Sequence, residues 1–307
     1  MKAVRIHEPE GLEGIEGLVY EEAPDPQPAI GDALVQVRAA SFTPTELTWP
    51  LRTDRAGHDR GPLIPAHEGS GVVAAVGYGT AGVSVGDEVY GLIDGYRDGW
   101  AAEYVIIEAR SLAPKPTTVD FVEAAAIPQA GLTSWQALFD HGHLESGQTV
   151  VIHGAGGGVG SIGVQLARWA GANVIGTGRA GARQRVLELG ADELLDVERD
   201  DWETAVGQVD LVYDAIGGDV LAHSPAIVKP GGALVSVMAP PQTDRDDIGT
   251  VHFVRDPSGA QLRDITRLVD QGKLEPQVGA VYSLEDAREA FMAKSTQHIP
   301  GKVVLTP

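Results

Sequence analysis

The chain has 307 residues, of which 43% are hydrophobic and 21% charged, a composition typical of a globular protein and not of a disordered or fibrous one. It contains no cysteine, which excludes disulfides, thiolate nucleophiles and cysteine-based zinc or iron–sulfur sites. The formal net charge of −20 repels phosphate backbones, so we expect no nucleic-acid partner.

The first part of the chain, residues 1–118, is predicted to be β-rich. It opens on the strand-like segment 1–6 without a signal peptide, and no apolar run reaches the roughly 18 residues that cross a bilayer, so we expect a cytoplasmic protein with no membrane partner. Short β-branched runs punctuated by glycine and proline predict a small antiparallel barrel or sandwich, with strands at 34–38, 71–76, 87–91 and 103–107. A helix follows over 121–127 and is expected to stop at Pro128.

The middle of the chain, residues 119–250, alternates strands and helices. This repeated βαβ pattern predicts a doubly wound parallel sheet, the α/β class of the Rossmann fold. The expected strands are 149–152, 173–177, 193–197, 209–215, 233–238 and 250–254, and the expected helices include 159–169, 182–189 and 219–228.

The last segment, residues 251–307, is too short for a domain and is expected to return to the first one. An amphipathic helix is predicted over 261–271, a second helix is expected to begin with Ser283 as its N-cap, and a strand is predicted over 302–306.

A glycine-rich turn lies between the strand ending at Ile152 and the helix beginning at Val159. Such a turn lets the backbone approach a pyrophosphate and directs free helix N–H groups at it, which makes Gly156, Gly157, Gly158 and Val159 candidate cofactor-binding residues. A glycine-rich loop alone can be a purely structural turn. Its place inside a βαβ repeat favours dinucleotide binding.

The residues after the second strand of this unit indicate which nicotinamide cofactor is used. An acidic residue there would accept hydrogen bonds from the ribose 2′-hydroxyl of NADH, but the sequence reads Gly178-Arg179, with Arg183 one helical turn later. Two arginines suit a 2′-phosphate, so the sequence predicts NADPH. The alternative is that both arginines are only solvated on an exposed loop.

Several motifs in sequence order resemble the medium-chain dehydrogenase/reductase superfamily, in particular its zinc-free quinone oxidoreductase (zeta-crystallin-like) branch. The resemblance spans essentially the whole chain and is carried by segments 64–73, 85–91, 123–128, 132–138, 229–235 and 301–305. It implies a GroES-like substrate domain over 1–118, a Rossmann NADP-binding domain over 119–250, and an active site in the cleft between them. It also places Ile216, Phe253 and Lys302 among the residues expected to bind the cofactor.

The resemblance further implies the absence of a catalytic metal. The zinc enzymes of this superfamily hold the ion with a cysteine, a histidine and a second cysteine or aspartate, and the matching positions here are Thr43, His67 and Gln129. Only one is a good ligand, whereas tetrahedral zinc needs three and a water. His67 and Glu68 are then expected to form a packed turn.

Without a Lewis acid, hydride transfer to an electron-poor acceptor is favoured over interconversion of simple alcohols and carbonyls. A quinone or an α,β-unsaturated carbonyl spreads the incoming charge onto an oxygen that a hydroxyl or water can meet, and Thr43, Tyr96 and Thr133 are the candidate catalytic residues. Trp49, Tyr96 and Trp100 either line an aromatic pocket or pack in the interior. An enoyl-thioester reductase and a non-catalytic NADPH-binding protein are the alternative functions.

The segment 250–254 also carries a prediction about assembly. It is β-prone, contains no proline or lysine, and comes at the end of the predicted sheet, where an edge strand can pair with another chain. We expect a two-fold homodimer, as the resemblance implies; the alternative is a monomer whose edge is covered by a loop.

Overall fold

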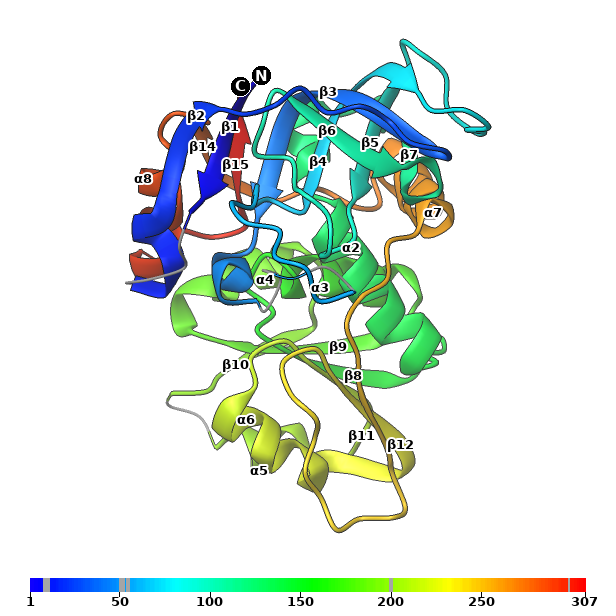
Figure 1. The fold of residues 1–307 in the computed structure, drawn as a ribbon. Coiled ribbons are helices and arrows are strands. Elements are labelled where there is room, and N and C mark those ends of the chain that lie inside the picture. Colours follow the sequence, from blue (N-terminus) through cyan, green and yellow to red (C-terminus); the bar gives the residue numbers. More distant parts are fainter. Residues whose placement is uncertain (8–11, 50–52, 54–55, 199–200, 298) are drawn as a thin grey trace. The chain divides into compact units, whose positions relative to one another are not determined.

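A computed structural model describes the chain except for residues 8–11, 50–52, 54–55, 199–200 and 298. The described chain forms two compact units (Figure 1). The first comprises Met1–Gln129, Asp256–Gly272 and Pro276–Pro307; the second comprises Ala130–Arg255 and Lys273–Glu275.

The opening segment of the first unit ends at Gln129, where residue 118 was expected, and the main segment of the second unit ends at Arg255, where residue 250 was expected. The first unit includes α1, Phe121–Ala125, because Ala125 and Ala126 are buried against Ala39 and Val304 of the first unit's sheet.

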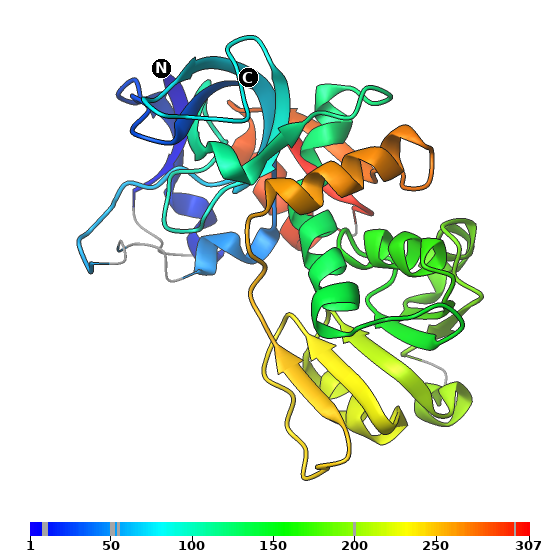
Figure 2. The same ribbon diagram turned by 90° about the vertical axis from the view of Figure 1, so that its right-hand side faces the viewer.

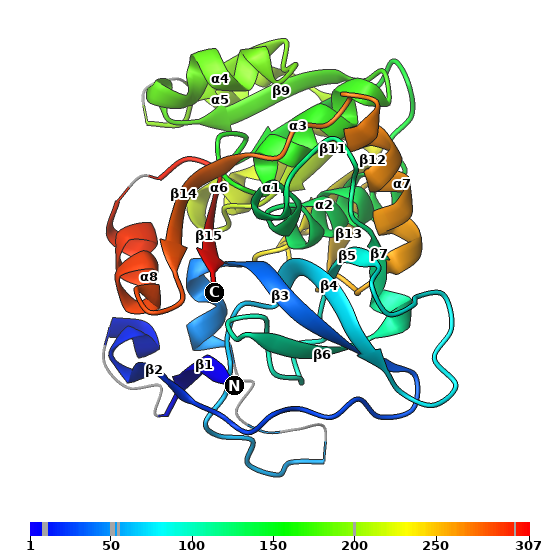
Figure 3. The ribbon, with the colours of Figure 1, turned by 90° about the horizontal axis from the view of Figure 1, so that it is seen from above.

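The first unit is built on a mixed seven-stranded sheet. Strand order is β14-β15-β3-β4-β5-β7 with β6 also paired to β3, and all pairs are antiparallel except β14 with β15 (Figure 3). A separate ribbon pairs β1 with β2. The strands are β1 Lys2–Ile6, β2 Leu18–Glu22, β3 Asp32–Phe42, β4 Glu68–Val76, β5 Glu88–Leu92, β6 Tyr104–Glu108, β7 Leu112–Pro114, β14 Val278–Ser283 and β15 Lys302–Thr306.

Helices pack on this unit from three parts of the chain: α1, α7 (Gly259–Asp270) and α8 (Ala287–Thr296), with 3-10 turns η1 Leu12–Gly17, η2 Pro44–Thr48 and η3 Ala109–Ser111. Residues 3–112 and residues 284–305 contribute to one hydrophobic core, in which the rings of Phe42 and Phe291 stack with centroids 3.7 Å apart. Most of the last segment, Asp256–Gly272 and Pro276–Pro307, is thus part of the first unit.

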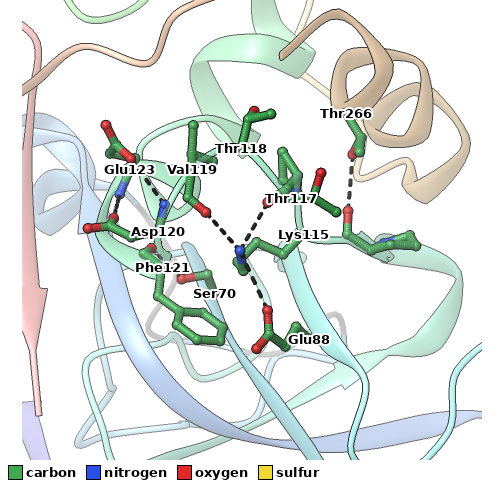
Figure 4. Close-up of polar contacts among 12 residues, drawn as sticks. Ser70, Glu88, Lys115, Thr117, Thr118, Val119, Asp120, Phe121, Glu123 and Thr266 are labelled. Atoms are coloured by element: carbon green, nitrogen blue, oxygen red, sulfur yellow. Dashed lines mark hydrogen bonds and ion pairs between the residues drawn. The ribbon is translucent and has the colours of Figure 1, made fainter. Parts of the chain in front are cut away.

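The entry to α1 is fixed by side chains shown in Figure 4. Asp120 caps the helix by accepting the N–H of Glu123, and the Glu123 carboxylate accepts the N–H of Asp120, forming a capping box. The Lys115 ammonium donates to the Val119 carbonyl at 2.8 Å, and the Ser70 hydroxyl of β4 donates to the Phe121 carbonyl at 2.5 Å. These bonds tie the helix to the sheet of its own unit.

The structure adds to one expected helix boundary and corrects another. Pro128 does not only end a helical run, since it is the first residue of α2, Pro128–Trp135; a missing N–H is harmless at the start of a helix. Ser283 is not the N-cap but the last residue of β14, and α8 begins at Ala287, directly after a three-residue turn, with Asp286 as N-cap. The Ser283 hydroxyl oxygen accepts the N–H of Asp286, so it stabilises the turn before the helix.

The second unit holds a six-stranded parallel sheet in the order β10-β9-β8-β11-β12-β13 (Figure 2). Counted along the unit this is order 3-2-1-4-5-6, the doubly wound order of dinucleotide-binding domains, and it confirms the predicted fold class. The strands are β8 Thr149–His153, β9 Asn173–Gly178, β10 Glu193–Asp196, β11 Val209–Asp214, β12 Val228–Ser236 and β13 Gly249–His252.

The helical segments of the second unit are α3 Gly160–Trp169, α4 Arg183–Glu188, α5 Trp202–Val206, α6 Gly218–His223, η4 Gln136–His141, η5 Ala180–Ala182 and η6 Ser224–Ile227, together with most of α2. The middle strands are apolar and buried because helices cover both faces of a parallel sheet. Among the described helices we find none long and apolar enough to cross a bilayer.

Candidate cofactor site and active site

The glycine loop leaves the carboxyl end of β8 at the point where strand order reverses, between β8 and β11. Gly154 has φ +79°, a conformation that L-residues with a side chain rarely adopt. The N–H groups of Gly154 and Ala155 both donate to the Thr177 carbonyl of β9 at 3.1 Å. A Cβ on Gly160 would lie 2.2 Å from the Gly154 carbonyl oxygen, so the helix can approach the strand this closely only with glycine there.

Gly157 leaves room on the outer side of the loop, whereas a Cβ on Gly156 would lie 2.7 Å from the Cβ of Ala182. A Cβ on Gly157 would meet only the Gly154 carbonyl oxygen, at 3.2 Å. Among the described residues, the N–H groups of Gly156 and Gly158 donate no hydrogen bond. Open backbone, free N–H groups and the first turn of a ten-residue helix form a site that fits a pyrophosphate.

A buried polar network supports the loop from inside the sheet. His153 is fully buried at the end of β8; its Nδ1 lies 2.8 Å from the Thr177 hydroxyl and its Nε2 3.0 Å from the Ser224 hydroxyl. Ser224 donates to the Val220 carbonyl at 2.7 Å, so Nε2 carries the proton and Thr177 donates to Nδ1. Burial lowers the pKa of His153 to about 4, which keeps the imidazole neutral.

Asp214, also fully buried, fixes the loop after β11. Its carboxylate accepts the N–H groups of Ile216 and Gly217 at 3.1 and 2.9 Å and the hydroxyl of Ser236 at 2.7 Å. Ile216 is 39% exposed and its side chain lies beside Gly154, where an added Cβ would be 3.1 Å away. The structure therefore places the predicted Ile216 next to the glycine loop, with an apolar surface available to a ligand.

The residues predicted to select NADPH follow β9. Gly178 ends that strand, and Arg179 is exposed with its Nε 3.2 Å from a carboxylate oxygen of Glu198. Arg183 is exposed at the start of α4. A third arginine, Arg185, was not among the predicted residues; its guanidinium donates to the Gly156 carbonyl of the loop.

Phe253 and Lys302, both expected to bind the cofactor, have different surroundings. Phe253 follows β13, and its ring packs at 4.4 Å from the ring of His141. Lys302 belongs to the first unit and is 5% exposed, with Nζ 2.6 Å from the Glu68 carboxylate and donating to the Phe42 carbonyl at 2.9 Å. Its ammonium is thus engaged in a buried ion pair within the sheet.

The positions that match zinc ligands lie in the first unit and carry few ligand groups. The Gln129 amide donates to the Thr43 hydroxyl oxygen, which joins two of the three positions by a neutral hydrogen bond. The third, His67, has its Nδ1 3.3 Å from a carboxylate oxygen of Glu46, and Glu46 also accepts the N–H of Ala66 at 2.7 Å. A hydroxyl and an amide are not the donors that zinc sites use, so this set does not fit zinc.

His67 and Glu46, both buried, lie at a pocket of the first unit lined by Ile6, His7, Glu46, Leu47, Trp49, Arg60, Gly61, Leu63, Ile64, Pro65, His67, Gly95 and Arg97. The predicted packed turn at His67 and Glu68 therefore also faces a cavity on its His67 side. Trp49 lines this pocket, with its ring 5.5 Å from that of His67.

The remaining predicted residues belong to different elements of the two units. Tyr96 is 42% exposed and its N–H donates to the Asp94 carboxylate at 2.8 Å. Trp100 is fully buried against Gly69, so of the two alternatives it has the packing role and does not line a pocket. Thr133 lies in α2 of the second unit and is 5% exposed. In the described parts of the chain, no three His, Asp or Glu side chains gather closely enough to hold a metal ion.

The doubly wound sheet with its glycine loop is typical of a dinucleotide-binding domain. Residues 189–305 match the family described as zinc-binding dehydrogenase, and residues 29–117 match the alcohol dehydrogenase GroES-like domain. Together with the relatives described next, these matches show that the chain belongs to the medium-chain dehydrogenase/reductase superfamily. Gln129, one of the zinc-matching positions, lies outside both matched ranges.

Three curated relatives extend over most of the chain. A probable zinc-binding mitochondrial oxidoreductase of Arthroderma benhamiae is 32% identical over 94% of this chain and 92% of its own length. A 2-methylene-furan-3-one reductase of Solanum lycopersicum is 31% identical over 89% and 71%, and an NADPH-dependent alkenal/one oxidoreductase of Arabidopsis thaliana, a chloroplast protein, is 29% identical over 89% and 72%.

Among solved structures, a quinone oxidoreductase from Coxiella burnetii superposes with a TM-score of 0.91 at 26% identity, covering 100% of this chain and 99% of that one. These similarities confirm the predicted family and fold and identify the protein as an NAD(P)H-dependent oxidoreductase.

Proposed function

We propose that the protein reduces quinones or α,β-unsaturated carbonyl compounds with NADPH and without a metal. The hydrogen bond from the Gln129 amide to the Thr43 hydroxyl carries this proposal, because it fills two zinc-matching positions with neutral groups. A site without a Lewis acid favours acceptors that delocalise the incoming charge by conjugation. The names of the tomato, Arabidopsis and Coxiella relatives support the same substrate class.

Bound NADPH would supply the hydride, and the chain's own residues would position the acceptor and stabilise its oxygen. Thr43 immediately precedes η2, is half-buried, and accepts its bond from Gln129. Since its hydroxyl proton has no acceptor among the described residues, it is available for an acceptor oxygen that gains charge. Tyr96 and Thr133 remain secondary proposals for the same role.

We also propose that NADPH is preferred over NADH. No carboxylate stands at Gly178 or Arg179, where a group for the ribose 2′-hydroxyl is expected, and Arg179 and Arg183 follow that position. The Glu198 carboxylate pairs with Arg179 and would have to yield part of that contact to a phosphate.

The first experiment measures NADPH and NADH oxidation with a quinone, an enone and an enoyl thioester, each with and without a chelator. The proposal is supported if the quinone or the enone is reduced and the chelator does not change the rate of that reduction. Preferential turnover of the thioester would favour the enoyl-thioester reductase, and tight NADPH binding without any turnover would favour a binding protein. Inhibition by the chelator that zinc reverses would contradict metal-free catalysis.

A second experiment tests Thr43 directly. Thr43→Val keeps the shape but removes the hydroxyl, so enone turnover should fall about 100-fold while NADPH affinity is unchanged. Thr43→Ser keeps the donor and serves as the matched control, with most of the activity retained. Equal activity of the valine and serine variants would remove Thr43 from the proposed mechanism.

We propose in addition that the protein is a two-fold homodimer joined at β13. This strand pairs only with β12 and is the edge of the second unit's sheet in the described chain. The N–H of Phe253 donates to the Ser236 carbonyl of β12, so by alternation the N–H of Thr250 points away from the sheet. Thr250→Pro should therefore give a monomeric mass in light scattering while preserving the fold; a monomeric wild type would refute the dimer.

The cytoplasmic location stays a prediction, because the fungal and Arabidopsis relatives are named as mitochondrial and chloroplast proteins.

A further inference from the structure

The guanidinium of Arg185 lies against the glycine loop. Arg185 is in the first turn of α4, and its Nη2 donates to the Gly156 carbonyl. The same turn approaches the loop through Ala182, whose Cβ would be 2.7 Å from a Cβ on Gly156. The segment after β9 and the loop after β8 are thus in direct contact.

Arg185 combines partial burial with the lack of a counter-ion, whereas Arg183, which also makes no ion pair with a described residue, is exposed. Arg179 pairs with Glu198 at 3.2 Å and Arg168 with Asp192 at 3.3 Å, both at exposed positions. Arg185 makes no ion pair with any described residue, and partial burial lowers its pKa. A charge taken partly out of water beside a single carbonyl is costly unless an anion joins it.

The loop that Arg185 touches provides the second feature. The N–H groups of Gly156 and Gly158 are free within the described chain, and α3 begins at Gly160. Free N–H groups at a helix start favour one phosphate of a dinucleotide. In this fold the end of the second strand, here β9, lies near the ribose 2′ position of the bound dinucleotide. Arg185 belongs to the helix that follows β9, so its charge is expected near the 2′-substituent.

Building on the proposed NADPH dependence, we propose that Arg185 is the principal residue that distinguishes NADPH from NADH by binding the 2′-phosphate. In doing so it exchanges a neutral carbonyl for a charged phosphate acceptor, a stronger partner for an arginine. Arg179 contributes less because its charge is already compensated by Glu198.

The test is to titrate NADPH and NADH into the wild type and into Arg185→Met, which keeps a long unbranched side chain but removes the charge that contacts the loop. We expect NADPH to bind about 10- to 100-fold more weakly to the variant, with NADH affinity changed less than about twofold. Arg168→Met removes the same charge at an exposed site of the same unit and should leave both affinities unchanged. Thermal unfolding of the ligand-free Arg185→Met variant should match the wild type.

Three results would overturn this assignment. Equal weakening of NADPH and NADH would mean that Arg185 contacts the pyrophosphate, unchanged NADPH affinity would mean that it only packs, and a larger loss in Arg179→Met would give the role to Arg179. A wild type that binds neither nucleotide would instead contradict the proposed function itself.

Discussion

The neutral, buried His153 should make the protein lose stability in mildly acidic solution. In the folded state its Nδ1 accepts from Thr177 and its Nε2 donates to Ser224, and its pKa is lowered from 6.5 to about 4 by burial. In the unfolded chain the imidazole is solvated and takes up a proton near its ordinary value of 6.5. The unfolded state therefore binds more protons than the folded state between these two values.

The sign and size of the effect follow from proton linkage. The stabilisation is complete above pH 6.5 and is lost progressively as the pH falls toward about 4. At about pH 5 the free energy of unfolding should be lower by about 2 kcal/mol than at neutral pH because of this residue alone.

The assay is urea unfolding of the wild type and of His153→Gln at about pH 7.5 and about pH 5, with tryptophan fluorescence as the signal. Trp202 reports on the right region, since its ring lies 5.0 Å from that of His153. The many acidic residues titrate alike in both proteins, so the wild type should lose about 2 kcal/mol more than the variant. An identical pH dependence of the two proteins would refute the assignment of a neutral histidine.

Two further sites lead to predictions. Lys302→Met should lower the free energy of unfolding by about 3–5 kcal/mol, because it leaves the buried Glu68 carboxylate without its cation, and adding Glu68→Gln should restore part of that loss in thermal unfolding. A greater loss in the double variant would show that the two charges do not act as a pair. Gly160→Ala should destabilise the second unit by about 1–3 kcal/mol, because its Cβ meets a loop carbonyl at 2.2 Å, whereas Gly181→Ala, with nothing within 4 Å, should not. Gly157→Val should abolish NADPH binding in a fluorescence titration while retaining the melting temperature, since its Cβ points into open space apart from one contact at 3.2 Å.

The sequence predicted the second unit well because local and long-range signals agree there. Apolar strands, intervening helices and the turn at Gly154–Gly160 all indicate a parallel doubly wound sheet, and the observed strands match the expected ones with shifts of a few residues at their ends. The largest shift is in β12, which starts at Val228, because the strand continues through an irregular register around the Pro230-Gly231-Gly232 segment.

The sequence was less informative where contacts join distant residues. Lys302 forms an ion pair with Glu68 only because β15 enters the sheet of the first unit. In the sequence alone, the same lysine could equally be interpreted as a residue that binds the cofactor. Arg185 was missed for a local reason. Arg183 and Arg185 are two positions apart on a helix and so point in different directions, and only the second is next to the buried Val186 and the loop.

The position of β15 has a consequence for the order of assembly during synthesis. Residues 130–255 are nearly all of the second unit, so that unit can form as soon as they are made, whereas β15 lies inside the first unit's sheet, between β14 and β3. Until residues 302–306 arrive, β3 keeps an open edge. In a nascent chain the second unit should therefore fold before the sheet of the first unit is complete. Removal of β15 should cause aggregation through β3 without preventing the second unit from folding.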